Sequence, residues 1–179
     1  MAGTRWLSDE EQRVWRDFMA AVDMVRGHVE SQLQRDSGMP HTYYEVLAAL
    51  SEEPGHTLRM SELAERCRSS RSRLSHAVAR LEDNGWVRRD HCATDKRGAF
   101  ARLTAEGFAA IQAAAPGHVE AVRQALFDVL TPEQVRALGE VMRTVRNQLS
   151  APCAAAIAEE DSVDAGSARC SARLGAPGR

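Results

Sequence analysis

The segment SSRSRLSHAVARLEDNGWVRRDHCATDKRG, which runs from Ser69 to Gly98, joins a helix pattern to a strongly basic loop. It opens with small polar and basic side chains, after which apolar side chains recur with the spacing of one helix face, at Leu74, Val78 and Leu81. Asn84-Gly85 ends this pattern, because glycine readily adopts the left-handed conformation that follows a helix. The segment therefore predicts an amphipathic helix whose first turns are polar and basic, with a charged loop beyond it.

The residues on either side of this helix predict a helix-turn-helix followed by a hairpin. A shorter helix, which Ser61 caps, precedes it across a tight connection of arginine and serine. Two extended pieces follow over residues 86–89 and 99–103, and a loop over residues 90–98 joins them. A helix pair followed by such a hairpin is typical of winged helix-turn-helix proteins, which bind DNA.

In a helix-turn-helix, the second helix lies in the major groove of DNA and contacts base edges from its first turns. Arginine can bind guanine through two hydrogen bonds, and serine hydroxyls can donate or accept them. The candidate DNA-binding side chains are therefore those near the entry end of the predicted helix, namely Ser70, Arg71, Arg73, Ser75 and His76. Arg80 lies at least one turn further on and is better placed to bind a phosphate.

The hairpin loop supplies a second set of DNA contacts. Lys96 and Arg97 lie at its tip, and a narrow basic loop suits the minor groove, where the potential is most negative. Gly98 permits a tight turn and a close approach to the duplex. Asp95 is expected to hold Arg97 or a neighbouring arginine in position through a salt bridge.

Longer helices are predicted towards both ends of the chain. A helix of about seven turns starts after Ser8 and ends near Ser37-Gly38, and a short helix follows it. Thr104 caps a fifth helix, which we expect to be interrupted at Pro116-Gly117, and a sixth starts at Thr131-Pro132. The first and sixth helices carry more apolar surface than one small lobe can bury. This favours a two-fold symmetric homodimer over a monomer in which the first, fifth and sixth helices bundle together.

The predicted fold is thus mainly α-helical, with about six helices and a two- or three-stranded wing sheet. We divide the chain into an N-terminal dimerisation helix, a DNA-binding lobe, C-terminal dimerisation helices and a tail, over residues 1–36, 37–103, 104–150 and 151–179. The tail is rich in alanine, serine, glycine and arginine and has no sustained period, so we expect it to be mostly disordered.

Charge and composition narrow the class of protein. The chain has a net charge of −2, but residues 58–103 hold eleven basic and six acidic side chains, which leaves +5 there and −7 elsewhere. A local positive field suits an anionic polymer as partner, although a solvated arginine-rich face accounts for the charge equally well. No apolar run is long enough for a membrane span, and no secretory signal is visible, so we expect a cytoplasmic protein without membrane association.

Two segments resemble the MarR family, the multiple antibiotic resistance regulators of bacteria. They are MSELAERCRSSRSRLSHAVARLEDNGWVRRD over residues 60–90 and DKRGAFARLT over residues 95–104. The family's wing signature is an Asp, one residue, an Arg and a short strand ending in Leu-Thr, and it is filled by Asp95, Arg97, Leu103 and Thr104. The stretches RWLSDEEQRVW and LTPEQVRAL are similar to actinobacterial members, so that the resemblance covers about residues 5–150.

The resemblance implies a homodimeric, sequence-specific regulator of transcription, most often a repressor on a palindromic operator that a small aromatic or phenolic ligand releases. Its partners would be double-stranded DNA and a second copy of the chain, and we expect no cofactor. By rough position in the family, the ligand pocket would be lined by His28, Gln32, Tyr43, Tyr44, Leu47 and His118. Tyr43 and Tyr44 could instead simply pack one helix against another.

Other classes of protein have weaker support in the sequence. A thiol- or metal-responsive regulator of the same fold stays open, but CxxC and HxxxH spacings are absent among the six histidines and the cysteines Cys67, Cys92, Cys153 and Cys170. We expect Cys67 to be a buried small side chain. Arg71, Arg73 and Arg97 argue against a winged-helix module that binds only proteins. An enzyme is not expected, because the sequence has no glycine-rich phosphate loop and no nucleophile elbow.

Overall fold

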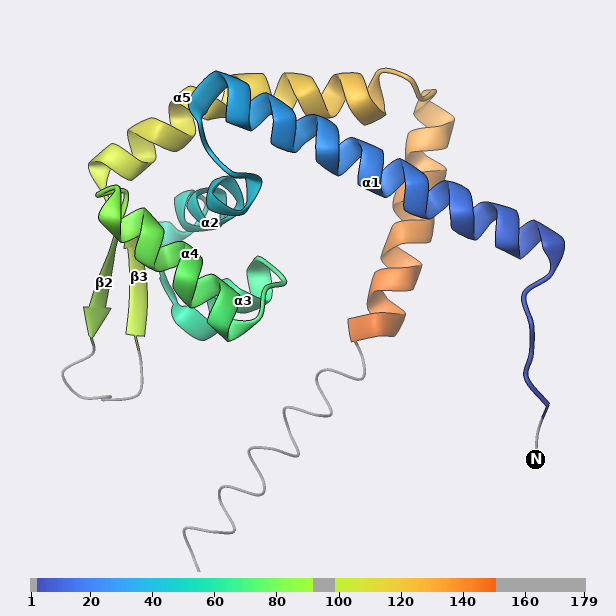
Figure 1. The fold of residues 1–179 in the computed structure, drawn as a ribbon, viewed down its shortest axis with the longest axis horizontal. Helices are drawn as coiled ribbons and strands as arrows, with labels where there is room; N and C mark the ends of the chain where they lie inside the picture. The colour runs from blue at the N-terminus through green and yellow to red at the C-terminus, as the bar shows by residue number, and fades with distance from the viewer. Residues whose placement is uncertain (1–2, 92–98, 151–179) are drawn as a thin grey trace, which may run out of the picture. The chain divides into compact units, whose positions relative to one another are not determined.

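The computed structural model describes residues 3–91 and 99–150 of the 179-residue chain (Figure 1). It comprises two compact units, Met1–Val129 and Leu130–Arg179, each of which is described by itself. Within the described residues, the first unit contains five α-helices and a three-stranded antiparallel sheet, and the second contains a helix over residues 132–150. The mainly helical winged helix-turn-helix fold predicted from the sequence is confirmed.

The long helix α1 (Asp9–Ser37) begins and ends where the sequence predicts. The Ser8 hydroxyl accepts a hydrogen bond from the backbone N–H of Glu11, and the Glu11 carboxylate accepts one from the N–H of Ser8. This capping box satisfies two amide groups that have no partner within the helix. Gly38 ends α1 in the left-handed conformation, at a φ of 60°. Burial within the unit is confined to the last third of the helix, at Val29, Gln32 and Leu33.

Three short helices, α2 (His41–Ser51), α3 (Met60–Arg66) and α4 (Arg71–Asp83), enclose the core of the first unit. The core contains fully buried leucines from these helices and from the end of α1, namely Leu33, Leu47, Leu50, Leu63, Leu74 and Leu81. The α3 helix starts one residue before Ser61, which the sequence favoured as its cap. The backbone N–H of Arg59 instead donates to the carboxylate of Glu62.

The sheet has the strand order β1-β3-β2 and is antiparallel throughout, with strands β1 (Thr57–Arg59), β2 (Val87–His91) and β3 (Ala99–Leu103). The hairpin strands β2 and β3 confirm the predicted extended pieces. β1 makes the sheet three-stranded, which the sequence left open, and it is followed directly by α3. The sheet thereby joins the hairpin to the first helix of the helix-turn-helix.

Helix α5 (Ala105–Val122) starts where the hairpin ends. The Thr104 hydroxyl caps it as predicted, because it accepts a hydrogen bond from the N–H of Gly107 at 3.0 Å and donates one to the carbonyl of Gly85 at 2.8 Å. Gly107 lies so close to the start of the hairpin that an added Cβ would meet the Trp86 carbonyl oxygen at 2.0 Å. The junction of hairpin and helix is therefore closed by direct backbone contact.

The predicted interruption of this helix at Pro116-Gly117 is wrong. Helix α5 continues through both residues, and α-helical geometry gives way only at the π-helical turn Arg123–Phe127. A proline removes one hydrogen bond from a helix, but packing against a neighbouring helix can offset that loss. Here α5 packs along α1, and a Cβ on Gly117 would lie 2.7 Å from the side-chain nitrogen of Gln32.

The helix of the second unit begins as the sequence predicts. The Thr131 hydroxyl accepts a hydrogen bond from the N–H of Gln134, and the Gln134 side chain accepts one from the N–H of Thr131. Val141, Val145 and Leu149 are exposed on this helix. None of the helices in the described ranges is both long enough and apolar enough to cross a membrane. The predicted tail over residues 151–179 lies outside the described residues.

Candidate nucleic-acid interface

A tight turn joins α3 to α4 and places the start of α4 at the surface. Arg68 adopts the left-handed conformation, with a φ of 48°, and the N–H of Ser69 donates to the carbonyl of Ala64. The Ser70 hydroxyl then caps α4 by accepting a hydrogen bond from the N–H of Arg73 at 3.3 Å. Ser70 is therefore the N-cap of α4, and this role occupies one acceptor of its hydroxyl.

The two faces of α4 differ sharply. The inner face is buried in the core at Leu74, Ala77, Val78 and Leu81. The outer face presents exposed side chains that the sequence singled out, namely Ser70, Arg71, Arg73, His76 and Arg80. Ser75 is only half-exposed and lies on the flank of the helix that faces β2. Five of the six candidate residues of this helix are thus exposed, and Ser75 is half-exposed.

Ion pairing divides the basic residues of the lobe into two groups. Several pair with nearby acids: Arg80 pairs with Asp83, Arg89 pairs with Glu82, and Arg88 and Arg102 share the single carboxylate of Asp90. Among the described residues, Arg71 and Arg73 form no ion pair. They lie in the first turn of α4, where the unpaired backbone N–H groups and the helix dipole also favour a negative ligand. Among the described residues, the positive charge of α4 that no acidic side chain pairs therefore lies in its first turn.

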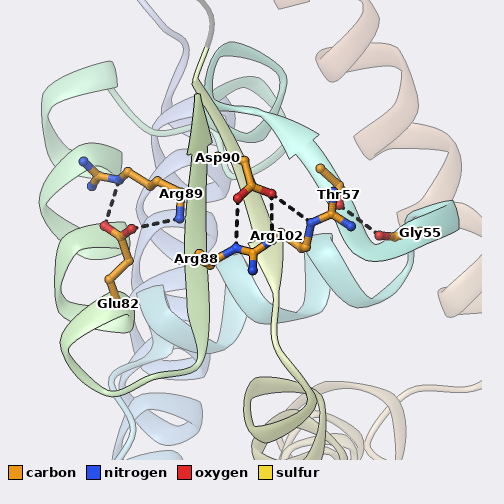
Figure 2. A network of polar contacts seen from close by, with 7 residues as sticks. All are labelled: Gly55, Thr57, Glu82, Arg88, Arg89, Asp90 and Arg102. Atoms are coloured by element: carbon orange, nitrogen blue, oxygen red, sulfur yellow. Dashed lines mark hydrogen bonds and ion pairs between the residues drawn. The ribbon is translucent and has the colours of Figure 1, made fainter. Parts of the chain in front are cut away.

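Arg89 joins β2 to α4 through side-chain contacts (Figure 2). Its Nη2 atom donates to the backbone carbonyl of Ser75 at 2.6 Å, and its Nε atom lies 3.0 Å from a carboxylate oxygen of Glu82. The other oxygen of the same carboxylate accepts a hydrogen bond from the N–H of Arg89 at 2.8 Å. We call this arrangement of Arg89, Glu82 and Ser75 the strand–helix clamp. This contact was not predicted from the sequence.

A second network lies on the exposed face of the hairpin. The Asp90 carboxylate accepts hydrogen bonds from Arg88 at 2.8 Å and from Arg102 at 3.0 Å, as Figure 2 shows. These two arginines hold the pKa of Asp90 below its usual range. Arg88 and Arg102 lie directly opposite each other across the strands, and like charges in such a pair repel. Asp90 relieves that repulsion. Side chains alternate between the two faces of a strand, so Arg88 and Asp90 lie on the same face of β2. This spacing was the sequence signal for the network.

The predicted wing tip is not described by the structure. Asp95, Lys96, Arg97 and Gly98 fall within residues 92–98, as does Cys92. The strands that lead to this loop are described, and they place its two ends on neighbouring antiparallel strands. The proposed roles of these four residues therefore stay predictions.

A cavity of about 390 Å³ lies between α2, α3 and α5, within the volume range of small-molecule sites. We call it the α2–α5 cavity. It is lined by His41, Tyr44, Glu45, Ala48, Ala49, Glu52, Arg66, Cys67 and His118. Of the six residues predicted to line a ligand pocket, the structure brings together Tyr44 and His118, whose ring centroids are 4.0 Å apart.

The other four predicted pocket residues lie elsewhere. Leu47 is fully buried in the core, and Gln32 is buried and donates a hydrogen bond to Asp36. His28 is exposed on α1, and Tyr43 lines a separate hollow beside Arg73 and His76. Neighbouring helix positions point in directions about 100° apart, so that Tyr44 faces this cavity and Tyr43 does not.

Cys67 is half-buried, so the expectation that it is buried is only partly met. Burial, and then the charge of Glu45, raise the pKa of its thiol to about 11. The thiol is therefore protonated at neutral pH, whereas reactive cysteines depend on the thiolate. Within residues 3–91 and 99–150, no three His, Cys, Asp or Glu side chains are grouped so that they could hold a metal ion.

Comparison with known proteins places these features in a family. The MarR family profile matches residues 37–98. Sco3205 of Streptomyces coelicolor, a MarR family regulator solved in complex with DNA, is 59% identical, with a TM-score of 0.77 over 80% of this chain and 89% of that chain. AbsC, a MarR family regulator of the same organism, is 39% identical, with a TM-score of 0.77 over 82% and 98% of the two chains. The transcriptional regulator HosA of Escherichia coli is 34% identical over 104 residues, which are 58% of this chain and 75% of HosA.

A winged helix-turn-helix whose second helix exposes, at its start, arginines that form no ion pair within the described chain is typical of DNA-binding proteins. The similarity to HosA and to the Streptomyces regulators makes the assignment more specific. The chain belongs to the MarR family of transcriptional regulators, as its wing signature predicted, and it is of the actinobacterial type. It is therefore a regulator of transcription and not an enzyme.

Proposed function

We propose that the protein is a cytoplasmic homodimer that represses transcription from a palindromic operator and is released from it by a small ligand. The observation that carries this proposal is the cluster of open positive charge at the start of α4. Arg71 and Arg73 are exposed there and form no ion pair with any residue that the structure describes, while the inner face of the helix is buried in the core. A recognition helix needs this combination of a fixed inner face and free polar side chains.

The roles of individual residues follow from their positions. Arg71, Arg73 and His76 are proposed to contact base edges, and Ser70 and Ser75 to contact the border of the groove. Arg80 is proposed to bind a phosphate, since it lies beyond the first turns and already pairs loosely with Asp83 at 3.5 Å. Lys96 and Arg97 on the wing would bind the minor groove, with Asp95 and Gly98 supporting them.

The exposed apolar residues of α1 support the dimer. On one side of its first half this helix exposes large apolar side chains that a stable monomer would leave in water, namely Val14, Trp15, Phe18 and Met19. Val14 is 62% exposed and Trp15 is 55% exposed. An exposed apolar face of this kind marks an interface. A second copy of the chain would cover it and would place two recognition helices on one duplex.

The double variant Trp15→Glu, Phe18→Glu is expected to be monomeric, because two carboxylates would have to be buried in the interface without partners. Size-exclusion chromatography with light scattering would show half the mass of the wild-type particle. Arg13→Glu is the matched control, since residue 13 lies on the opposite side of α1 from Trp15. A double variant that stays dimeric would contradict the proposed interface.

Footprinting on the DNA upstream of the protein's own gene tests the proposed operator. We expect protection of an inverted repeat whose half-sites lie about one helical turn, or 10 base pairs, apart from centre to centre. Protection should vanish for the monomeric variant. If the protected sequence has no two-fold symmetry, or if DNA without the repeat competes equally, sequence-specific binding by a dimer is wrong.

The α2–α5 cavity is the proposed site of the releasing ligand. Its walls include Arg66 and Cys67, at the end of the first helix of the helix-turn-helix, and His118 on α5. A ligand bound there would contact both the DNA-binding lobe and the helix that follows it. Thiol control is the less favoured alternative, because the raised pKa of Cys67 opposes thiolate chemistry.

A further inference from the structure

The charge of the α2–α5 cavity restricts the ligands that it can bind. Its basic side chain is Arg66, whose guanidinium forms an ion pair with the carboxylate of Glu53, a residue outside the lining. Glu45 and Glu52 contribute two carboxylates to the wall. Glu45 lies 3.7 Å from Nδ1 of His41 and forms an ion pair with it when that imidazole is protonated, whereas Glu52 has no ion pair among the described residues. The cavity therefore presents carboxylate charge that the arginine of its wall does not offset.

Neighbouring groups respond to this negative charge. After burial, the charge of Glu45 raises the pKa of the Cys67 thiol, and the charge of Glu52 raises the pKa of the Tyr44 hydroxyl. Each of these groups would become an anion on losing its proton, and a carboxylate of the wall disfavours that anionic form. The carboxylate of a bound ligand would meet the same opposition.

The remaining wall suits an aromatic body with a hydrogen-bond donor. Ala48 and Ala49 provide small apolar side chains, and Tyr44 and His118 provide two rings at 4.0 Å. The face of an aromatic ring attracts a cation within about 6 Å. Burial, and then the charge of His41, lower the pKa of His118, so its imidazole is neutral at pH 7. Within the described chain, the buried Nδ1 atom of that ring has no hydrogen-bond partner.

We propose that the α2–α5 cavity binds a protonated amine carried on an aromatic ring, in preference to an aromatic carboxylate. The ammonium group would lie near Glu45 and Glu52, against the ring of Tyr44, and the apolar body would lie on Ala48 and Ala49. The inference rests on the proposed function, since it names the chemical class of the releasing ligand.

Three probes with the same phenyl body and different charge test the inference: phenethylamine, 2-phenylethanol and phenylacetate. Isothermal titration calorimetry with the full-length protein at pH 7 would measure the Kd of each probe at one salt concentration. We expect phenethylamine to bind about tenfold more tightly than 2-phenylethanol, and phenylacetate to bind most weakly. Equal or tighter binding of phenylacetate would overturn the inference, as would the failure of all three probes to bind at millimolar concentration.

Removal of the wall charges provides the second test. Glu52→Gln and Glu45→Gln keep the size of each side chain, and each is expected to reduce the preference for phenethylamine over 2-phenylethanol about threefold. Glu106→Gln is the control, because this exposed acid in the first turn of α5 does not line the cavity. A preference that survives the double replacement of Glu45 and Glu52 would overturn the assignment.

Operator binding in the same preparations separates the two proposals. If the wild-type protein prefers phenethylamine but keeps its operator affinity, the cavity assignment is supported and release by a ligand of this class is wrong. If the protein binds the operator but binds phenylacetate more tightly than phenethylamine, the proposed DNA-binding function is supported and the proposed class of ligand is wrong. Release of the operator by phenethylamine, with Glu52→Gln weakening the response, would support both.

Discussion

Replacing Gly107 by alanine is expected to destabilise the fold by about 3 kcal/mol or more, the upper end of the range for inserting an atom into a packed site. The added Cβ would lie 2.0 Å from the Trp86 carbonyl oxygen and 2.8 Å from a methyl carbon of Leu103. The carbonyl belongs to the backbone and accepts a hydrogen bond from the N–H of Thr104, so it cannot rotate away as a side chain would. The start of α5 and the start of the hairpin must separate.

The free energy of unfolding in urea, at one protein concentration, would measure this effect. Gly27→Ala is the matched control, because Gly27 lies inside α1 and an added Cβ there meets no atom within 4 Å. Alanine is the better helix former, and this variant should be stabilised by about 0.5–1 kcal/mol. The close approach at Gly107 would be contradicted if both variants shifted the unfolding transition equally.

Replacing both Arg71 and Arg73 by alanine is expected to weaken operator binding about thirtyfold or more. Loss of an arginine contact to a base costs about 1–3 kcal/mol, and the two side chains are not held by other residues of the described chain. Their exposure also means that the fold should tolerate the change, so the melting temperature should stay close to that of the wild type. Band-shift titrations on the operator and on random DNA would give the two affinities.

The ratio of the two affinities distinguishes base contacts from phosphate contacts. Base contacts predict that the operator affinity falls much more than the affinity for random DNA. Equal losses on both DNAs, with a shallower dependence of log K on log salt, would assign Arg71 and Arg73 to phosphates instead. Arg35→Ala removes one positive charge from the last turn of α1, and it should change operator affinity by no more than about twofold.

The boundaries of α4 were predictable because they depend on local chemistry. Ser70 caps the first turn with its own hydroxyl, and Gly85 adopts a φ of 74° directly after the helix. The same holds for Ser8 at the start of α1 and Thr104 at the start of α5. In each case, a side chain and a backbone group a few residues apart determine where the helix starts or ends.

The features that escaped prediction depend on contacts between distant residues. Pro116 predicts a break on its own, but packing of α5 on α1 keeps the helix continuous. Strand β1 has three residues and forms because β3 pairs with it. Arg89 is one of the eleven basic side chains counted over residues 58–103, but its side chain is half-buried against Ser75 and Glu82. Which face of α2 lines the cavity likewise depends on where α5 lies.

The strand–helix clamp has a mechanical consequence for the choice of operator. Because Arg89 holds the carbonyl of Ser75 and the carboxylate of Glu82, β2 cannot tilt away from α4 unless a half-buried ion pair and two hydrogen bonds are broken. The base of the wing and α4 therefore move as one rigid unit. In the proposed homodimer, operators that differ in length would be accommodated by a change in the distance between the rigid units of the two copies, since neither unit can change its shape by itself.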